Sequence, residues 1–290
     1  MALVSGCGID TGGGDDSDSK STASPLSRAK SATVIVLNHA GNKTYQSSGV
    51  VYDTSRGLVL TSATAVWDRD SLEVETSQGR KLKSRLVARS PCGDIAVILL
   101  DPKPPGLTAV HVGRSAGLKV GQRLTALGFV AGEGGTYRAS ETTGTTAATD
   151  ASVSLDKTLP AHPSLVEHQA PVAATLAGGP LVDSHGNLAG INSVLNTYGD
   201  APDAPADLSF AASSDYVKSR VAELKPTTHA FYEGWEAEHE CHNQFQDLVR
   251  KHRGTMSSEP MESSHSSMGS DDSGSKGKDD SMKDSDHMKK

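Results

Sequence analysis

Short runs of β-branched and other apolar residues, each ended by a turn signal, follow one another along most of this chain. Examples are SATVIVLN (31–38), SSGVVYD (47–53) and DIAVILLD (94–101). The segments between such runs, among them HAGNKT and PKPPG, are rich in residues that end strands. The one clear helix within this region is the closing segment 215–224, which Ser213 or Ser214 would cap. Many short strands and a single closing helix favour an all-β fold, either a pair of barrels or a sandwich.

The composition of the middle region supports a buried core. Residues 31–224 are rich in Val, Leu, Ile, Ala, Gly and Thr, which is enough apolar material for a β core of this length. The formal net charge is −7 and no basic stripe is present, so we expect no nucleic-acid partner. No apolar run is long enough to predict a membrane-spanning helix.

The first 30 residues contain a possible lipidation signal and a linker. MALVSGCG matches the lipobox of bacterial lipoproteins, which predicts a lipid on Cys7. The apolar stretch before Cys7 is shorter than a signal peptide needs. Either the true start lies upstream, or the match is a coincidence. The polar stretch 8–30 is typical of a flexible tether. We therefore expect an extracytoplasmic bacterial protein, either anchored to the cell membrane through Cys7 or secreted.

The C-terminal 66 residues have two predicted parts. Residues 225–253 read as a helical extension, because an amphipathic stripe at 228–252 includes Phe231 and Trp235. Residues 254–290 are polar and charged, and we expect them to be disordered. Methionine and histidine in this tail leave weak copper binding open, and EAEHECHN leaves a zinc site open. Solvated surface is the preferred interpretation of both, so we predict no metal and no cofactor.

Cysteine usage agrees with export. Cys92 and Cys241 remain if Cys7 is lipidated, and two thiols can pair in an oxidising compartment. The alternative is two separate buried thiols, because the spacing in the sequence does not give their distance.

Several segments resemble trypsin-like serine proteases of the HtrA branch, in the right order over about residues 31–224. SSGVVYDTSRGLVLTSATAVWD resembles the first active-site strand, and GRKLKSRLVARSPCGDIAVILL the stretch with the family aspartate. AGGPLVDSHGNLAGIN looks like the nucleophile strand, and LSFAASSDYVKSRV like the closing strand and helix. The resemblance implies an all-β fold of two six-stranded barrels. The HtrA branch usually carries a further PDZ domain, which we do not expect here because too few residues follow 224.

The resemblance also locates the three catalytic positions. Thr64 stands where the family has its histidine, Asp94 retains the family aspartate, and Ala177 stands at the serine position. The family reaction needs a nucleophilic hydroxyl, an imidazole base and a carboxylate that orients the base. The oxyanion positions fall on Thr175 and Ala177, and Thr175-Leu176 replaces the usual Gly-Asn. These departures predict a catalytically inactive member, a pseudoprotease.

Three functions stay open for such a chain. The first is a binding or scaffold module for an extended peptide or an envelope protein, which would pair along Ser193, Val194 and Leu195. The second is a purely structural domain without a groove. The third is a serine-type endopeptidase with non-standard catalytic residues. Candidates for that rebuilt site are Ser62, Thr64, Ser193, His162, His168 and His185. We expect Asp94 to be structural and to accept a hydrogen bond from Thr64.

Overall fold

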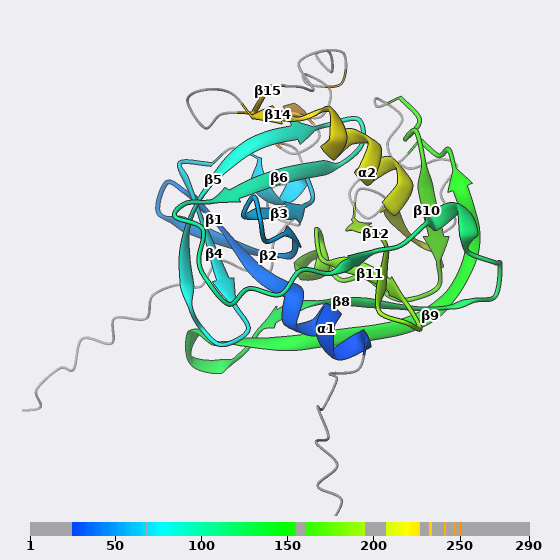
Figure 1. Cartoon of the computed structure of the whole chain (residues 1–290), viewed down its shortest axis with the longest axis horizontal. Coiled ribbons are helices and arrows are strands. Elements are labelled where there is room, and N and C mark those ends of the chain that lie inside the picture. Colours follow the sequence, from blue (N-terminus) through cyan, green and yellow to red (C-terminus); the bar gives the residue numbers. More distant parts are fainter. Residues whose placement is uncertain are drawn as a thin grey trace, which may run out of the picture.

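The structure is a computed structural model of the chain (Figure 1). It describes residues 25–67, 69–154, 160–194, 207–226, 232–233, 241, 246–247 and 250. Cys7 and the predicted tail 254–290 lie outside the described residues. None of the described helices has the length and the apolar composition needed to span a membrane.

Six antiparallel strands close the first barrel, in the order β1-β2-β3-β6-β5-β4. The strands are β1 (Thr33–Ala40), β2 (Lys43–Asp53), β3 (Leu58–Thr61), β4 (Ser71–Thr76), β5 (Lys81–Ser90) and β6 (Ile95–Leu100). A short 3-10 helix, η1 (Thr64–Val66), follows β3. Valine, leucine and isoleucine side chains from all six strands fill the interior. The closed ring leaves no strand edge unpaired, which explains why short strands suffice.

The second barrel is built from β8 to β13. Its order is β11-β8-β9-β10-β13-β12, the pairing of β11 with β12 closes it, and β7 adds to β12 in parallel. The strands are β7 (His111–Val112), β8 (Arg123–Ala131), β9 (Tyr137–Ala151), β10 (Leu165–His168), β11 (Pro180–Asp183), β12 (Asn187–Ser193) and β13 (Ser209–Ser213). Three 3-10 helices lie between them: η2 (Ser115–Gly117), η3 (Glu133–Gly135) and η4 (Ala174–Leu176). The structure thus confirms the predicted double barrel.

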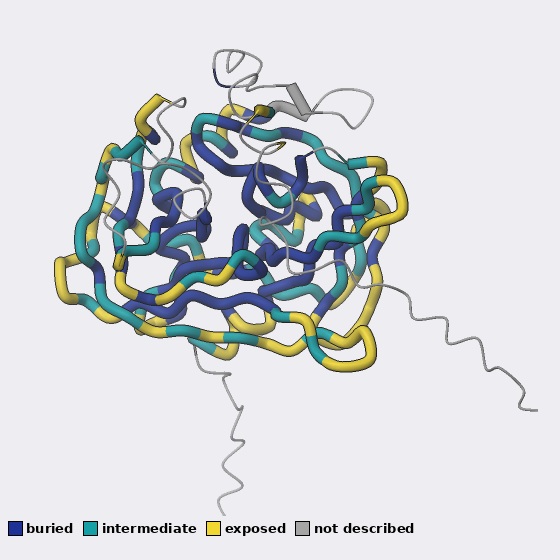
Figure 2. Tube along the Cα trace, turned by 180° about the vertical axis from the view of Figure 1, so that it is seen from behind, coloured by how far each residue is buried: buried dark blue, intermediate teal, exposed yellow. Residues whose placement is uncertain are grey.

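A shared core joins the two barrels. It contains side chains from both of them, such as Leu60 and Ile191, together with residues of the two helices α1 (Pro25–Ala32) and α2 (Ser214–Glu223). Strand β1 is buried on both faces, because Val34 and Val36 fill its own barrel while alternate residues pack against the second barrel. Figure 2 shows the buried residues along the strands and exposed residues mainly at the outer turns.

Helix α1 corrects the sequence-based prediction of a linker to residue 30 and a strand from residue 31. Proline is tolerated in a first helical turn. Ala29 and Ala32 are completely buried in the shared core, and the Thr33 hydroxyl donates a 2.8 Å hydrogen bond to the Ala29 carbonyl. The helix is therefore stabilised by tertiary packing, which a polar sequence such as SRAKSA does not indicate.

The predicted helix at 228–252 is wrong at its start. The structure places β15 (Tyr232–Glu233) there and pairs it with β14 (Lys225–Pro226). Helical backbone is described at Cys241, 246–247 and Arg250. Phe231, Trp235 and the other residues of the predicted stripe lie outside the described residues. Strands of two residues are too short to produce a periodic pattern of apolar residues, so the sequence does not predict this pairing.

Candidate functional site

Asp94 lies at the end of the loop between β5 and β6 and is almost completely buried. Its Oδ1 atom accepts hydrogen bonds from the Ser62 hydroxyl at 3.1 Å and the Thr64 backbone N–H at 3.0 Å. Its Oδ2 atom accepts a 2.6 Å hydrogen bond from the Ser193 hydroxyl on β12. The residue also has a left-handed backbone with a φ of 42°, a conformation that Asp tolerates better than most residues. All three donors are neutral.

Burial raises the pKa of the Asp94 carboxyl to about 6. The hydrogen bonds from Ser193, Thr64 and Ser62 act in the opposite direction, because they stabilise the charged form. Desolvation outweighs them. An imidazolium beside the carboxylate would compensate its charge, but hydroxyl and amide donors compensate it only in part.

Thr64 begins η1, and its side chain is buried at the histidine position. The hydroxyls of Ser62 and Thr64 form a short hydrogen bond. The Asn38 side chain holds this turn by donating to the carbonyls of Ala65 and Trp67, at 3.1 and 2.9 Å. The predicted link between Thr64 and Asp94 is therefore present through the backbone N–H. Threonine has no group that titrates near neutral pH, so it is no substitute for the imidazole.

Ala177 follows η4 and is also buried. Its methyl group belongs to a small apolar cluster with Val194, Val172 and Ala174. Its N–H donates a 3.1 Å hydrogen bond to the Ala174 carbonyl within the 3-10 turn. In an oxyanion hole, this N–H would point at the substrate. Here it is hydrogen-bonded within the protein and does not face a substrate site.

Ser48 on β2 stabilises this turn from the first barrel. Its hydroxyl donates a 2.7 Å hydrogen bond to the Thr175 carbonyl, and its N–H donates at 3.0 Å to the Ala177 carbonyl. The Phe129 N–H donates to the same Ser48 hydroxyl at 2.9 Å. The carbonyls of both predicted oxyanion residues, Thr175 and Ala177, thus accept hydrogen bonds that join the second barrel to the first. This role of Ser48 has no signal in the sequence, because nothing in the SSG segment indicates a partner so distant along the chain.

The Gly-Gly pair after Ala177 explains how closely the barrels approach. Gly178 has a φ of 79°, and a Cβ built there would lie 2.5 Å from the Ser48 carbonyl oxygen and 2.6 Å from the Ser62 nitrogen. The Gly178 N–H donates to the Asn192 carbonyl at 2.8 Å. Only glycine fits a positive φ and this close approach of backbone atoms.

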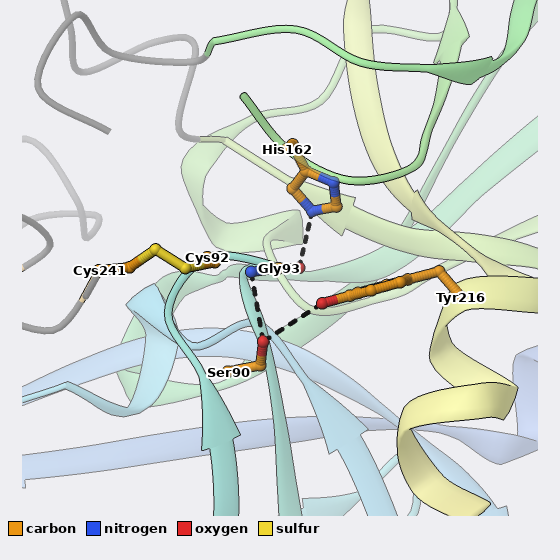
Figure 3. Close-up of a disulfide and its surroundings, with 6 residues drawn as sticks. All are labelled: Ser90, Cys92, Gly93, His162, Tyr216 and Cys241. Carbon is orange, nitrogen blue, oxygen red and sulfur yellow. Dashed lines mark hydrogen bonds between the residues drawn. A yellow bond between two sulfur atoms is a disulfide. The ribbon is translucent and has the colours of Figure 1, made fainter. Parts of the chain in front are cut away.

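The loop that carries Asp94 is held from three sides (Figure 3). A disulfide joins Cys92 to Cys241, 149 residues further along the chain, with a Cα–Cα distance of 5.4 Å. His162 Nε2 lies 2.8 Å from the Gly93 carbonyl oxygen. The Tyr216 hydroxyl on α2 is 3.3 Å from the Ser90 hydroxyl. The structure therefore shows a disulfide between Cys92 and Cys241, and not two separate buried thiols.

The three candidate histidines lie in other surroundings than the Asp94 cluster. His162 donates through Nε2 to Gly93 while its Nδ1 accepts from the Ser164 N–H, so it is held neutral, and burial lowers its pKa to about 4. Burial also lowers the pKa of His168 to about 4. His185 lies in the exposed turn between β11 and β12, 3.9 Å from Asp183. The structure therefore gathers Ser62, Thr64 and Ser193 at Asp94, without an imidazole among its described partners.

The predicted peptide-binding positions fall at the end of β12. Ser193 and Val194 are buried, the former against Asp94 and the latter against Ala177, and Leu195 lies outside the described residues. Among the residues that the structure describes, no group of three or more His, Cys, Asp and Glu side chains is arranged to hold a metal ion.

Comparison with known proteins identifies the family. The family model described as a trypsin-like peptidase domain matches residues 47–191, which is half of the chain. The periplasmic serine endoprotease DegP of Salmonella typhimurium is 30% identical over 178 residues, which cover 61% of this chain and 35% of DegP. The serine protease PepD of Mycobacterium tuberculosis is 29% identical over 212 residues, which cover 68% of this chain and 44% of PepD.

The solved structures agree. An HtrA-type protease, AlgW with a tripeptide, superimposes with a TM-score of 0.58 at 26% sequence identity, over 69% of this chain and 62% of AlgW. This chain spans only about a third to a half of the length of the curated relatives described above. The fold, the order of the motifs and all three comparisons lead to one conclusion: the chain belongs to the trypsin-like peptidase family and is similar to its HtrA-type members.

Proposed function

We propose that this protein is a catalytically inactive, HtrA-like member of the family that acts by binding a polypeptide. The observation that carries this proposal is the turn at Ala177. The nucleophile position has a methyl group buried among apolar side chains, and its N–H is bonded to Ala174. Neither an attacking oxygen nor this oxyanion donor is available to a substrate carbonyl.

The remaining residues do not replace what is missing. In a protease of this chemistry, loss of the serine alone costs about 10⁶-fold in turnover, and the residual ~10³–10⁴-fold over water depends on the oxyanion hole and substrate binding. With the Ala177 N–H bonded internally, even that residual activity is reduced. Thr64 accepts no proton near neutral pH, and Asp94 is saturated with neutral donors.

One observation favours the alternative, a serine-type endopeptidase with non-standard residues. The hydroxyls of Ser62 and Ser193 contact a carboxyl group whose pKa is raised to about 6, and such a carboxylate is a possible general base. However, Ser62, Ser193 and Asp94 are all buried, whereas a nucleophile must contact the substrate. We therefore keep peptidase activity as the second candidate.

The binding role rests on similarity. An HtrA-type protease with this fold has been solved with a tripeptide, and main-chain pairing of an extended peptide requires no catalytic residue. We propose the segment from Ser193 to Leu195 as the place where the polypeptide lies. Periplasmic relatives favour a location outside the cytoplasm. Lipid anchoring at Cys7 is part of the proposal and is tested by labelling the expressed protein with a radioactive fatty acid, with Cys7→Ser as the control.

Digestion of casein, read by mass spectrometry, tests whether the protein is inactive. The wild-type chain is compared with Ser62→Ala, Ser193→Ala and Asp94→Asn. We expect no cleavage by any of the four proteins. Cleavage by the wild-type chain that disappears in Ser62→Ala or Asp94→Asn contradicts the proposal and identifies the substitute site. A double variant, Thr64→His with Ala177→Ser, restores the two side chains of the family. We expect it to stay inactive, because the N–H of residue 177 remains hydrogen-bonded to the Ala174 carbonyl.

A further inference from the structure

Two arginines and a tryptophan form a group next to the Thr64 turn. Trp67 directly follows η1 and is almost completely buried. The guanidinium carbon of Arg89, on β5, lies 3.8 Å from the centre of the Trp67 ring. Arg69 follows two residues after Trp67, and its Nη1 atom donates a 3.2 Å hydrogen bond to the Val66 carbonyl. We call Arg69, Arg89 and Trp67 the arginine pair and its tryptophan.

The two guanidinium groups contact two consecutive residues, because Arg69 bonds to the Val66 carbonyl and Arg89 lies over the Trp67 ring. Burial lowers the pKa of Arg69, and the positive charge of Arg89 lowers it further. Burial also lowers the pKa of Arg89. Two like charges held side by side and half-buried are unfavourable unless an opposite charge compensates them. The face of Trp67 compensates Arg89 only in part, because a cation–π contact is weaker than an ion pair with a carboxylate.

No described residue supplies that opposite charge. The ion pairs of the described chain involve other residues, and neither Arg69 nor Arg89 pairs with a carboxylate among them. Asp68, between Trp67 and Arg69, lies outside the described residues and is therefore included in the test below. Within the described part of the chain, the arginine pair is thus a local excess of positive charge in a protein whose formal net charge is −7.

The surroundings hold this group in place. The Asn38 side chain donates to the Trp67 carbonyl, and Arg89 lies opposite Ala96 in the paired strands β5 and β6. Trp67 directly follows the turn that begins at Thr64, the residue at the family's histidine position, so the group is attached to one side of the candidate site. A rigid pair of planar, fork-shaped donors matches the two oxygens of a carboxylate.

We propose that Arg69 and Arg89 bind a carboxylate side chain of the polypeptide ligand, so that the protein prefers acidic segments. The proposal rests on the proposed function, because it names the chemistry of the same ligand. Trp67 positions Arg89 by stacking beneath it. The oxygens of an Asp or Glu side chain accept hydrogen bonds from the two guanidinium groups and neutralise their mutual repulsion.

Two pools of short peptides test the preference. They are identical except that one carries Glu where the other carries Gln, and binding is measured at one fixed ionic strength by fluorescence polarisation. We expect the Glu pool to bind about tenfold more tightly, equivalent to ~1.4 kcal/mol. Arg69→Gln and Arg89→Gln should remove the preference. Arg138→Gln, at an exposed position on β9, should keep it. Asp68→Asn should keep or strengthen it, and loss of the preference in this variant contradicts the proposal.

The outcomes separate the two proposals. Equal binding of both pools overturns the acidic preference and leaves the binding function intact. If neither pool binds, the binding function fails, and the arginine pair is examined with N-acetylglutamate. The chain has two tryptophans, so the fluorescence of Trp67 is measured alone in a Trp235→Phe variant. A fluorescence change on adding N-acetylglutamate that is absent in Arg89→Gln supports a carboxylate site, and no change in either protein overturns it.

Discussion

The two sides of the candidate site differ in chemical character. On the first-barrel side, Asp94 remains polar, buried and hydrogen-bonded, with neutral donors around it. On the second-barrel side, Ala177 has become part of an apolar cluster and its N–H has turned to Ala174. Neither side is loosely packed. The Asp94 carboxyl and the Ala177 N–H are both hydrogen-bonded within the protein, which agrees with the proposal that the site performs no chemistry.

Replacing Gly178 by alanine tests the apolar side most severely. The added methyl group would collide with backbone atoms of Ser48 and Ser62, and the positive φ would be strained. We expect a loss of about 4 kcal/mol or more in the free energy of unfolding, measured by urea titration. Gly121→Ala is the control, because its φ is 82° and nothing lies within 4 Å of the added Cβ. Equal losses in both variants would mean that backbone strain, and not the packing of the barrels, explains the effect.

Replacing Asp94 by alanine tests the polar side. The change leaves the Ser62 and Ser193 hydroxyls and the Thr64 N–H without their acceptor, and alanine is less suited to the left-handed backbone. We expect a loss of about 3 kcal/mol, because buried donors without a partner are costly. Urea unfolding at neutral pH measures it. A loss below that of an ordinary surface substitution would show that Asp94 does not hold the site together.

The pH dependence of stability separates the charge of Asp94 from its hydrogen bonds. Its folded pKa, about 6, lies above the reference value of 3.8, so folding binds a proton between these values. Its contribution to stability is therefore fully present below pH 3.8 and is lost as the pH rises through 6. The difference in unfolding free energy between wild type and Asp94→Asn should shift in favour of wild type as the pH falls from 7 to 4. Asp207→Asn, at an exposed residue, is the matched control.

Restoring the serine alone should have the smallest effect. In Ala177→Ser the hydroxyl enters the cluster with Val194, and we expect a loss of about 1 kcal/mol and no cleavage of casein. Ala139→Ser, at an exposed position on β9, is the matched control. Recovery of proteolysis in Ala177→Ser would mean that the Ala177 N–H is released readily, and the contrast between the two sides would then disappear.

The sequence by itself determined the all-β class, because strand period and turn chemistry are local properties. Its resemblance to the family, carried by motifs such as LTSATAV and AGGPL, added the double barrel and placed Thr64 and Ala177 at two catalytic positions. The sequence also indicated that Cys92 and Cys241 are able to pair, but not that they are close together.

Only the tertiary structure decided how the remaining groups are used. Ser193 reaches Asp94 across 99 residues of chain, and Ser48 reaches Thr175 across 127. Helix α1 exists because Ala29 and Ala32 pack into the shared core, and the strand at 232–233 replaces the start of a predicted helix. The charge of Arg69 and Arg89 is visible in the sequence, but their proximity is not. Contacts between residues distant along the chain depend on how the barrels close and pack, and no local pattern reports them.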